Sequence, residues 1–216
     1  MNASTSLADG VYSTLKERIL RFEYSAGDPL TELALASELR ISRTPIRQAL
    51  QRLGHDNLVD IIPRKGVVVK GISEAEIKEV YLIRQGLEGI CCRRTAELIS
   101  EQKLQKLEAA MEKANKLVEE GQPDEASESA DELHRVILSM GSEGRIETIV
   151  KSITEITYWL HQIALATPGR LEKSIQEHAH VVEALKARDA DEAEKRIRAH
   201  IRSTEADVLA VYINHK

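Results

Sequence analysis

A change of pattern near residue 70 limits what this chain can fold into. Before it, "LVDIIPRKGVVVK" has β-branched residues on both sides of "PRKG", which is typical of a two-stranded hairpin. Gly66 at its tip can adopt the positive φ that a tight turn requires. After it, stretches such as "LQKLEAAMEKANKLVEE" repeat apolar residues with a period of 3.6 and carry charged outer faces. We therefore expect a mostly α-helical chain with one small hairpin.

Three helices are predicted before the hairpin. Apolar residues recur at three- and four-residue steps from Leu7 to Phe22, and "YSAGDPL" then interrupts the pattern with a glycine and a proline. Residues 32–39 are expected to form a second helix, and a third follows the turn "RIS" and ends near His55. Pro45 fits the first turn of that helix, where amides have no intrahelical acceptor. This order predicts a winged helix-turn-helix, with the hairpin as its wing.

Positive charge is concentrated in the third helix and the hairpin. The whole chain has a net charge of −5, yet residues 40–70 contain seven Lys or Arg against two Asp or Glu. On the third helix, arginines and glutamines fall opposite an apolar face. In the major groove, arginine can pair bidentately with guanine and glutamine with adenine. For an isolated helix a solvated charged face is the more common explanation, but a winged helix-turn-helix favours DNA binding.

The chain is predicted to divide into a DNA-binding domain, residues 1–72, and an all-helical bundle of five to seven helices, residues 73–216. Ser73 can cap the first helix of the bundle, with Glu76 completing a capping box. No apolar run reaches the roughly 18 to 20 residues of a membrane helix, and "MNASTSLADG" lacks the features of a signal peptide. We therefore expect a cytoplasmic protein with no membrane partner.

Several histidines of the second region are predicted to point into the bundle. Helical spacing gives each an apolar face, whereas His180 falls on an outer face. A single inward histidine is more often a hydrogen-bonded core residue than a ligand. Several together suggest a divalent transition metal, for which imidazoles from facing helices plus a carboxylate are common ligands. We expect zinc, with nickel and manganese as alternatives. The inward histidines are His134, His161, His178 and His200.

The first region resembles the GntR family of bacterial transcription regulators. The resemblance covers residues 6–72 and rests on "SRTPIRQALQRL", the following "LV" and "PRKGVVV". It implies that the third helix enters the major groove and that the wing contacts a neighbouring groove or the backbone. The DNA-binding residues expected on this basis are Arg43, Thr44, Arg47, Arg64, Lys65 and Gly66, and the outer face of the third helix adds Gln48.

The second region is similar to the FCD effector domain of the FadR-like branch of that family. The similarity spans about residues 74–213 and rests on "YLIRQGLEG", "ADELHRVIL" and "TPGRLEKSIQEHAHVVEALKARDADEAEKRIRAHI". It implies a metal held by an aspartate and three histidines. The family aspartate falls on Ala130 here, so Asp131 is a shifted ligand, or water, His161 or the effector takes the fourth position. The histidine ligands implied are His134, His178 and His200.

Together these features predict a sequence-specific transcription regulator that acts as a homodimer on two-fold symmetric operator DNA. Repression relieved by a small organic acid bound at the metal is the expected mode. The candidate effector-binding residues are Arg84, Tyr158 and His161, and Arg84 could equally form a structural ion pair. One alternative is a regulator for which the metal itself is the signal. A metal-dependent enzyme is less expected, since HExxH, a nucleophile elbow and a phosphate loop are absent from the sequence. We expect no catalytic residues.

Overall fold

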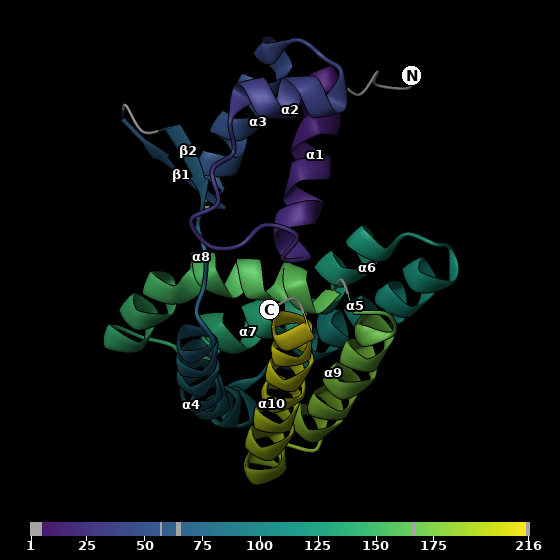
Figure 1. Cartoon of the computed structure of the whole chain (residues 1–216). Coiled ribbons are helices and arrows are strands. Elements are labelled where there is room, and N and C mark those ends of the chain that lie inside the picture. Colours follow the sequence, from purple (N-terminus) through teal and green to yellow (C-terminus); the bar gives the residue numbers. More distant parts are fainter. Residues whose placement is uncertain (1–5, 57, 64–65, 166, 215–216) are drawn as a thin grey trace.

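The computed structural model describes residues 6–56, 58–63, 66–165 and 167–214 (Figure 1). The N-terminal region of this described part holds three helices and a hairpin. Their bounds match the predicted ones closely. The elements are α1 (Leu7–Leu20), α2 (Glu32–Leu39), α3 (Arg43–His55), β1 (Val59–Ile62) and β2 (Gly66–Val69).

Side-chain caps explain where the first two helices begin. Ser6 and Asp9 form a capping box at the start of α1, and the Thr31 hydroxyl accepts from the Ala34 amide at the start of α2. Ser42 is the N-cap residue of α3 but makes no side-chain cap hydrogen bond. The three helices bury a common apolar core, which fixes the direction in which α3 presents its outer face. Its fully buried members include Leu15, Ile19, Ile46 and Leu53.

The hairpin has the predicted form. Its strands are antiparallel, with Val59 opposite Val69 and Ile62 opposite Gly66. Gly66 has φ +101°, a conformation that L side chains rarely adopt. The two basic residues expected at the wing tip, Arg64 and Lys65, lie outside the described residues.

The C-terminal region is all-helical over its described residues. Its seven helices are the upper limit of the predicted five to seven. Ser73 caps the first of them, and Glu76 completes the predicted capping box. The mostly helical fold class, with one small hairpin after the N-terminal helices, is confirmed. The helices are α4 (Glu74–Leu98), α5 (Glu101–Glu119), α6 (Pro123–Ala130), α7 (Glu132–Gly141), α8 (Arg145–Leu165), α9 (Arg170–Lys186) and α10 (Ala190–Asn214).

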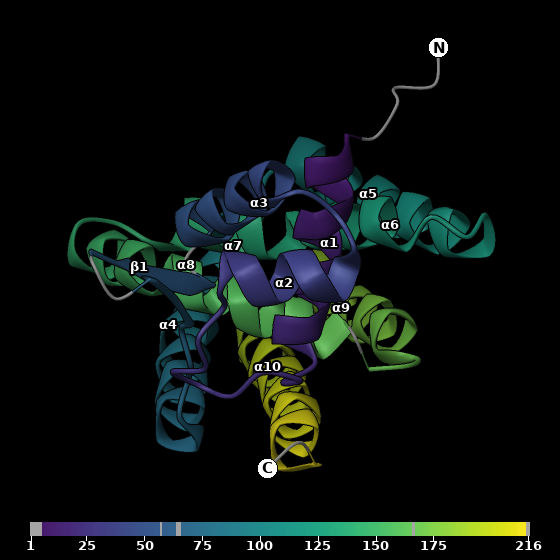
Figure 2. The ribbon, with the colours of Figure 1, turned by 45° about the horizontal axis from the view of Figure 1, so that its top comes forward.

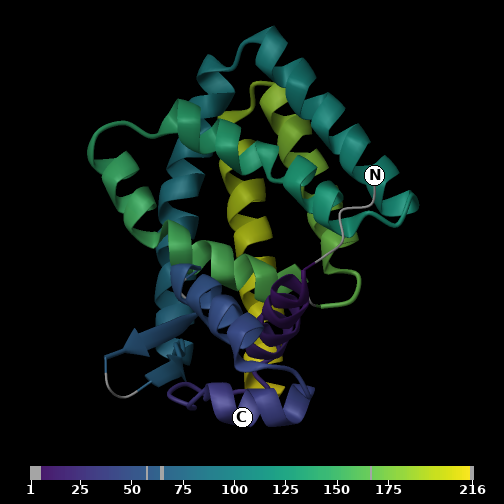
Figure 3. The ribbon, with the colours of Figure 1, turned by 90° about the horizontal axis from the view of Figure 1, so that it is seen from above.

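Two long helices, α4 and α10, lie side by side through the C-terminal region, and α7 and α8 cross them (Figures 1 and 3). The crossing of α7 over α4 is close because Gly141 has no side chain. A Cβ there would lie 2.4 Å from the Cα of Cys91. This packing brings α7, α9 and α10 around one interior space.

Helix α8 lies between the rest of the C-terminal region and the N-terminal helices (Figures 1 and 2). The Lys16 ammonium of α1 sits 5.6 Å from the centre of the Tyr158 ring of α8. In a second contact between the two regions, Phe22 meets Tyr212 of α10 edge to face, with ring centres 5.2 Å apart. Within the described ranges, no helix is both long and apolar enough to cross a membrane.

Candidate metal centre and pocket

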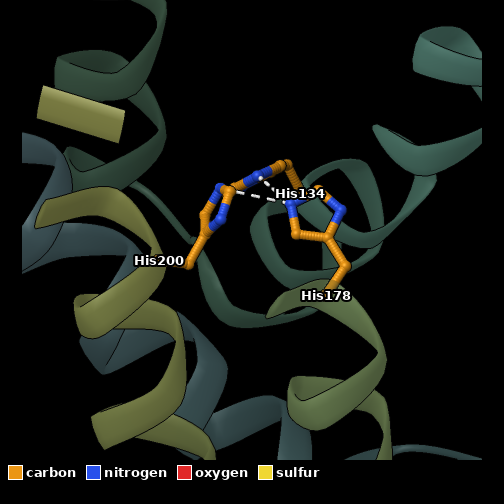
Figure 4. Close-up of side chains that lie close together, drawn as sticks. All are labelled: His134, His178 and His200. Carbon is orange, nitrogen blue, oxygen red and sulfur yellow. Dashed lines mark hydrogen bonds between the residues drawn. The ribbon is translucent and has the colours of Figure 1, made fainter. Parts of the chain in front are cut away.

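Three histidines from three helices meet inside the C-terminal region (Figure 4). The Nε2 atom of His178 on α9 lies 3.2 Å from Nε2 of His134 on α7 and 3.2 Å from Nε2 of His200 on α10. His178 and His200 are buried, and His134 is half-buried. Among the residues that the structure describes, these three form a group that could hold a metal ion, with one possible ligand atom from each lying within 4.8 Å of the others. We call them the three-histidine cluster.

Each imidazole of the cluster has an acceptor at its other nitrogen. Nδ1 of His134 lies 2.6 Å from the Glu88 carboxylate, and Nδ1 of His200 lies 2.8 Å from the Glu177 carboxylate. Nδ1 of His178 lies 3.1 Å from the carbonyl oxygen of Ala130. An ionised carboxylate or a carbonyl can only accept, so each Nδ1 donates its proton. The tautomers that follow carry a lone pair at every Nε2.

These lone pairs point at one another with no proton between them, which is unfavourable unless a cation lies among them. Zn–N bonds of 2.0–2.1 Å in a tetrahedral site would separate the ligand nitrogens by about 3.3 Å, close to the spacing of the cluster. Metal-bound histidines also donate their second nitrogen to a carboxylate or carbonyl. The donor set therefore fits a divalent transition metal.

Burial affects the protonation of the cluster. Desolvation, together with the neighbouring imidazoles, holds the pKa of His178 and of His200 well below 6.5. Glu88 is buried, which raises its pKa, but Arg84 and His134 outweigh burial and hold the pKa below its usual range. Neutral imidazoles beside ionised carboxylates are the protonation state that binds a metal.

Metal-free protein should lose stability as the pH falls below 6.5. The unfolded chain protonates its histidines near that pH, while folded His178 and His200 stay neutral, so protons favour the unfolded state. The free energy of unfolding should fall by about 1.4 kcal/mol per pH unit for each of these histidines. Urea unfolding of chelator-treated protein between pH 7.5 and 5.5 measures this slope. The slope should persist in His180→Ala, an exposed site, and should decrease in His178→Leu; an equal slope in both variants would contradict the assignment.

A cavity of about 370 Å³ opens beside the cluster. Arg84, Tyr158 and His161, the predicted effector-binding residues, all line it. Tyr158 is 54% exposed and reaches the cavity from the α8 side. Arg84 borders the cavity and also forms a buried 2.7 Å ion pair with Glu88, the structural alternative expected for it, so its effector-binding role stays a prediction.

Asp131 also lines the cavity but stands apart from the three-histidine cluster. Its carboxylate lies 3.4 Å from Nε2 of His161, which the Ser127 hydroxyl approaches to 3.1 Å. The carbonyl oxygen of Ala130, the position at which the resemblance would place an aspartate, contacts His178. As a metal ligand, Asp131 stays a prediction.

Several residues that were not predicted from the sequence surround the three-histidine cluster and hold its side chains in place. Glu88 and Glu177 orient two imidazoles, and neither was predicted. Glu88 follows Arg84 by one helical turn, a spacing that could have indicated a pair. Arg170 is buried and bridges Glu177 and Asp207 at 2.6 and 3.0 Å. Its Nε and the Thr157 hydroxyl, both on cavity-lining residues, have no hydrogen-bond partner in the described part of the chain.

The second predicted site is the outer face of α3. Its four predicted DNA-binding side chains are exposed, while the opposite side of the helix is buried. Gly66, at the wing, is also exposed. The exposed residues on α3 are Arg43, Thr44, Arg47 and Gln48.

Two known families match this chain and together span most of it. The FCD domain matches residues 79–203, more than half of the chain, and bacterial regulatory proteins of the gntR family match residues 7–69. The chain belongs to the GntR family and carries an FCD domain. As a member of the GntR family it is a DNA-binding transcriptional regulator.

Relatives of this GntR regulator include named repressors. It is 25% identical over 215 residues to the HTH-type transcriptional repressor RspR of Escherichia coli, covering 98% of this chain and 92% of RspR. It is 27% identical over 184 residues to the gluconate operon transcriptional repressor of Bacillus licheniformis, covering 82% and 74%. Lar, described as controlling expression of the Listeria monocytogenes agr system, shares the fold, with a TM-score of 0.66 at 20% identity over 97% of this chain and 99% of Lar.

Proposed function

We propose that this GntR regulator is a cytoplasmic repressor whose operator affinity is controlled by a small organic acid bound at a metal in the FCD domain. Residues 1–72 bind the operator, and residues 73–216 bind metal and effector and form a homodimer. The observation that carries the proposal is the three-histidine cluster at the wall of a 370 Å³ cavity. The metal would be zinc, with nickel or manganese as alternatives.

The cavity chemistry supports an anionic effector. A metal held by His134, His178 and His200 keeps at least one position open, and a carboxylate is a suitable ligand for it. Arg84 and the unpartnered Nε of Arg170 add positive charge and a free donor to the same wall. Tyr158 and His161 border the remaining space. The fourth metal position then goes to the effector, to water, to His161 or to Asp131.

Operator recognition rests on α3 and the wing. Arg43, Thr44, Arg47 and Gln48 would read base edges in the major groove, while Arg64, Lys65 and Gly66 contact the wing-side groove or backbone. Two copies of α3 must lie about one helical turn of DNA apart to match a two-fold operator. The effector controls affinity only if it binds one arrangement of the two copies more tightly than the other, by about 1–3 kcal/mol in typical allosteric proteins.

One titration tests the proposal against its alternatives. DNA enriched by the wild-type protein from a random duplex library serves as the operator, and its affinity is measured at fixed salt with chelator-treated protein, with zinc alone, and with zinc plus a panel of small carboxylic acids. The proposal is supported if the operator affinity changes only when zinc and one acid are both present. A full change of operator affinity with zinc alone indicates a metal sensor, and conversion of an acid to product indicates an enzyme. An operator affinity that stays the same under every condition would overturn the proposal.

The orienting carboxylates give a further prediction. Glu177→Ala should weaken zinc binding about 10- to 100-fold, because Nδ1 of His200 loses the acceptor that fixes its ring. Competition with a chromophoric chelator measures the affinity. Glu183→Ala, an exposed position on the same helix, is the matched control. Equal zinc affinity in both variants would mean that Glu177 does not orient a ligand.

A further inference from the structure

An acidic residue of α2 contacts two of the arginines proposed to read DNA. Glu32 is in the first turn of α2, and α2 packs beside α3 (Figure 2). Its Oε1 accepts from Nε of Arg47 at 2.7 Å, and its Oε2 accepts from Nη2 of Arg47 at 2.9 Å. The same Oε2 also accepts from Nε and Nη2 of Arg43, at 3.1 and 2.9 Å. One carboxylate therefore holds two guanidinium groups.

The way in which Glu32 binds the arginines leaves part of each guanidinium available. Both contacts use the Nε side of the group, with Nε and Nη2 as donors. A guanidinium has five N–H donors, and the outward pair on Nη1 and Nη2 stays free in this arrangement. That outward pair is suited to the two major-groove acceptors of guanine. Arg43 and Arg47 are 60% and 59% exposed, so DNA can reach them.

We propose that Glu32 is a specificity-determining positioning residue, which holds Arg43 and Arg47 side-on so that their outward donors are oriented for bases before DNA binds. This inference rests on the proposed function, because it requires these arginines to read base edges. Glu32 acts through the arginines and needs no contact with DNA.

Two physical effects follow from this arrangement. Long side chains that are already ordered lose less conformational entropy on binding, so specific pairing becomes more favourable. The carboxylate also offsets one of the two positive charges, which weakens sequence-independent attraction to phosphates. Both effects raise the ratio of specific to non-specific affinity.

The decisive variant is Glu32→Gln, compared with Glu38→Gln. Both substitutions remove one negative charge from α2, but Glu38 pairs with Arg18 outside α3. The operator is the DNA enriched by wild-type protein, and poly(dI-dC) is the non-specific probe. Glu32→Gln should lower the affinity ratio between the two DNAs about tenfold, the effect expected from releasing two ordered side chains. It should also steepen the salt dependence of poly(dI-dC) binding by about one unit of log–log slope. Glu38→Gln should keep the wild-type ratio.

A double-mutant cycle tests whether Glu32 acts through the arginines. In an Arg47→Ala, Arg43→Ala background, Glu32→Gln should no longer change the affinity ratio. A wild-type ratio in Glu32→Gln, or an equal fall in Glu38→Gln, would overturn the inference. Thermal unfolding of each variant separates a loss of specificity from a loss of folding. If wild-type protein enriches no sequence at all, the proposed DNA-reading function fails before Glu32 is tested.

Discussion

His178→Ala should abolish stoichiometric zinc binding. His178 is the central member of the three-histidine cluster, since its Nε2 lies 3.2 Å from both other Nε2 atoms. Losing a direct ligand should cost more than the 10- to 100-fold typical of losing an orienting partner. Elemental analysis of dialysed, untagged protein should give about one metal per wild-type chain and almost none for the variant. The response of the protein–DNA complex to carboxylic acids should be lost with the metal.

His180→Ala is the matched control for this experiment. It removes the same side chain two residues further along α9, from an exposed position. Its metal content and its response to acids should equal those of wild type. If wild-type protein holds no metal even after reloading with zinc, the cluster is not a metal site. The three histidines would then be direct hydrogen-bonding partners of the effector.

Arg47→Ala should weaken binding to the enriched operator about 5- to 150-fold, the equivalent of about 1–3 kcal/mol, and should weaken binding to random DNA much less. The reason is that a bidentate contact with a base edge is lost only on the specific sequence. Fluorescence anisotropy with both DNAs at one salt concentration measures the two losses. As a control, Arg21→Ala, which changes an exposed arginine at the end of α1, should leave the affinity for both DNAs unchanged. If Arg47→Ala weakened binding to both DNAs equally, Arg47 would contact phosphates rather than bases.

Local rules predicted most of the fold. The capping box of Ser73 and Glu76, the glycine at the hairpin and the period of 3.6 each depend on residues close in the sequence, and each was found as expected. The relative placement of the helices depends instead on contacts between distant residues. The close crossing of α4 and α7 at Gly141 is one example, because its partner Cys91 lies 50 residues away in the sequence.

The histidines of the candidate site were predicted from the sequence, but their hydrogen-bond partners were not. Helical spacing indicated that His134, His178 and His200 point inward, and the resemblance to FCD domains implied that they meet. The partners at Nδ1 were not predicted, because Glu88 and Glu177 reach histidines on other helices and no spacing links them. The contacts of Glu32 were not predicted for the same reason, since the arginines that it binds lie 11 and 15 residues further along the chain.

One turn of helix α8 borders both the cavity and the N-terminal region, and this limits how ligand preference can change during evolution. Tyr158 forms part of the cavity wall and also lies beneath Lys16 of the N-terminal region. The adjacent Trp159 borders the space between the two regions, and His161 returns to the cavity. Under the proposed function, a substitution along this turn that alters which ligand fits would also alter the contact between the two regions. Ligand preference and strength of regulation are therefore expected to change together in the descendants of this protein, and variation along α9, which also lines the cavity, offers a way to change one while keeping the other.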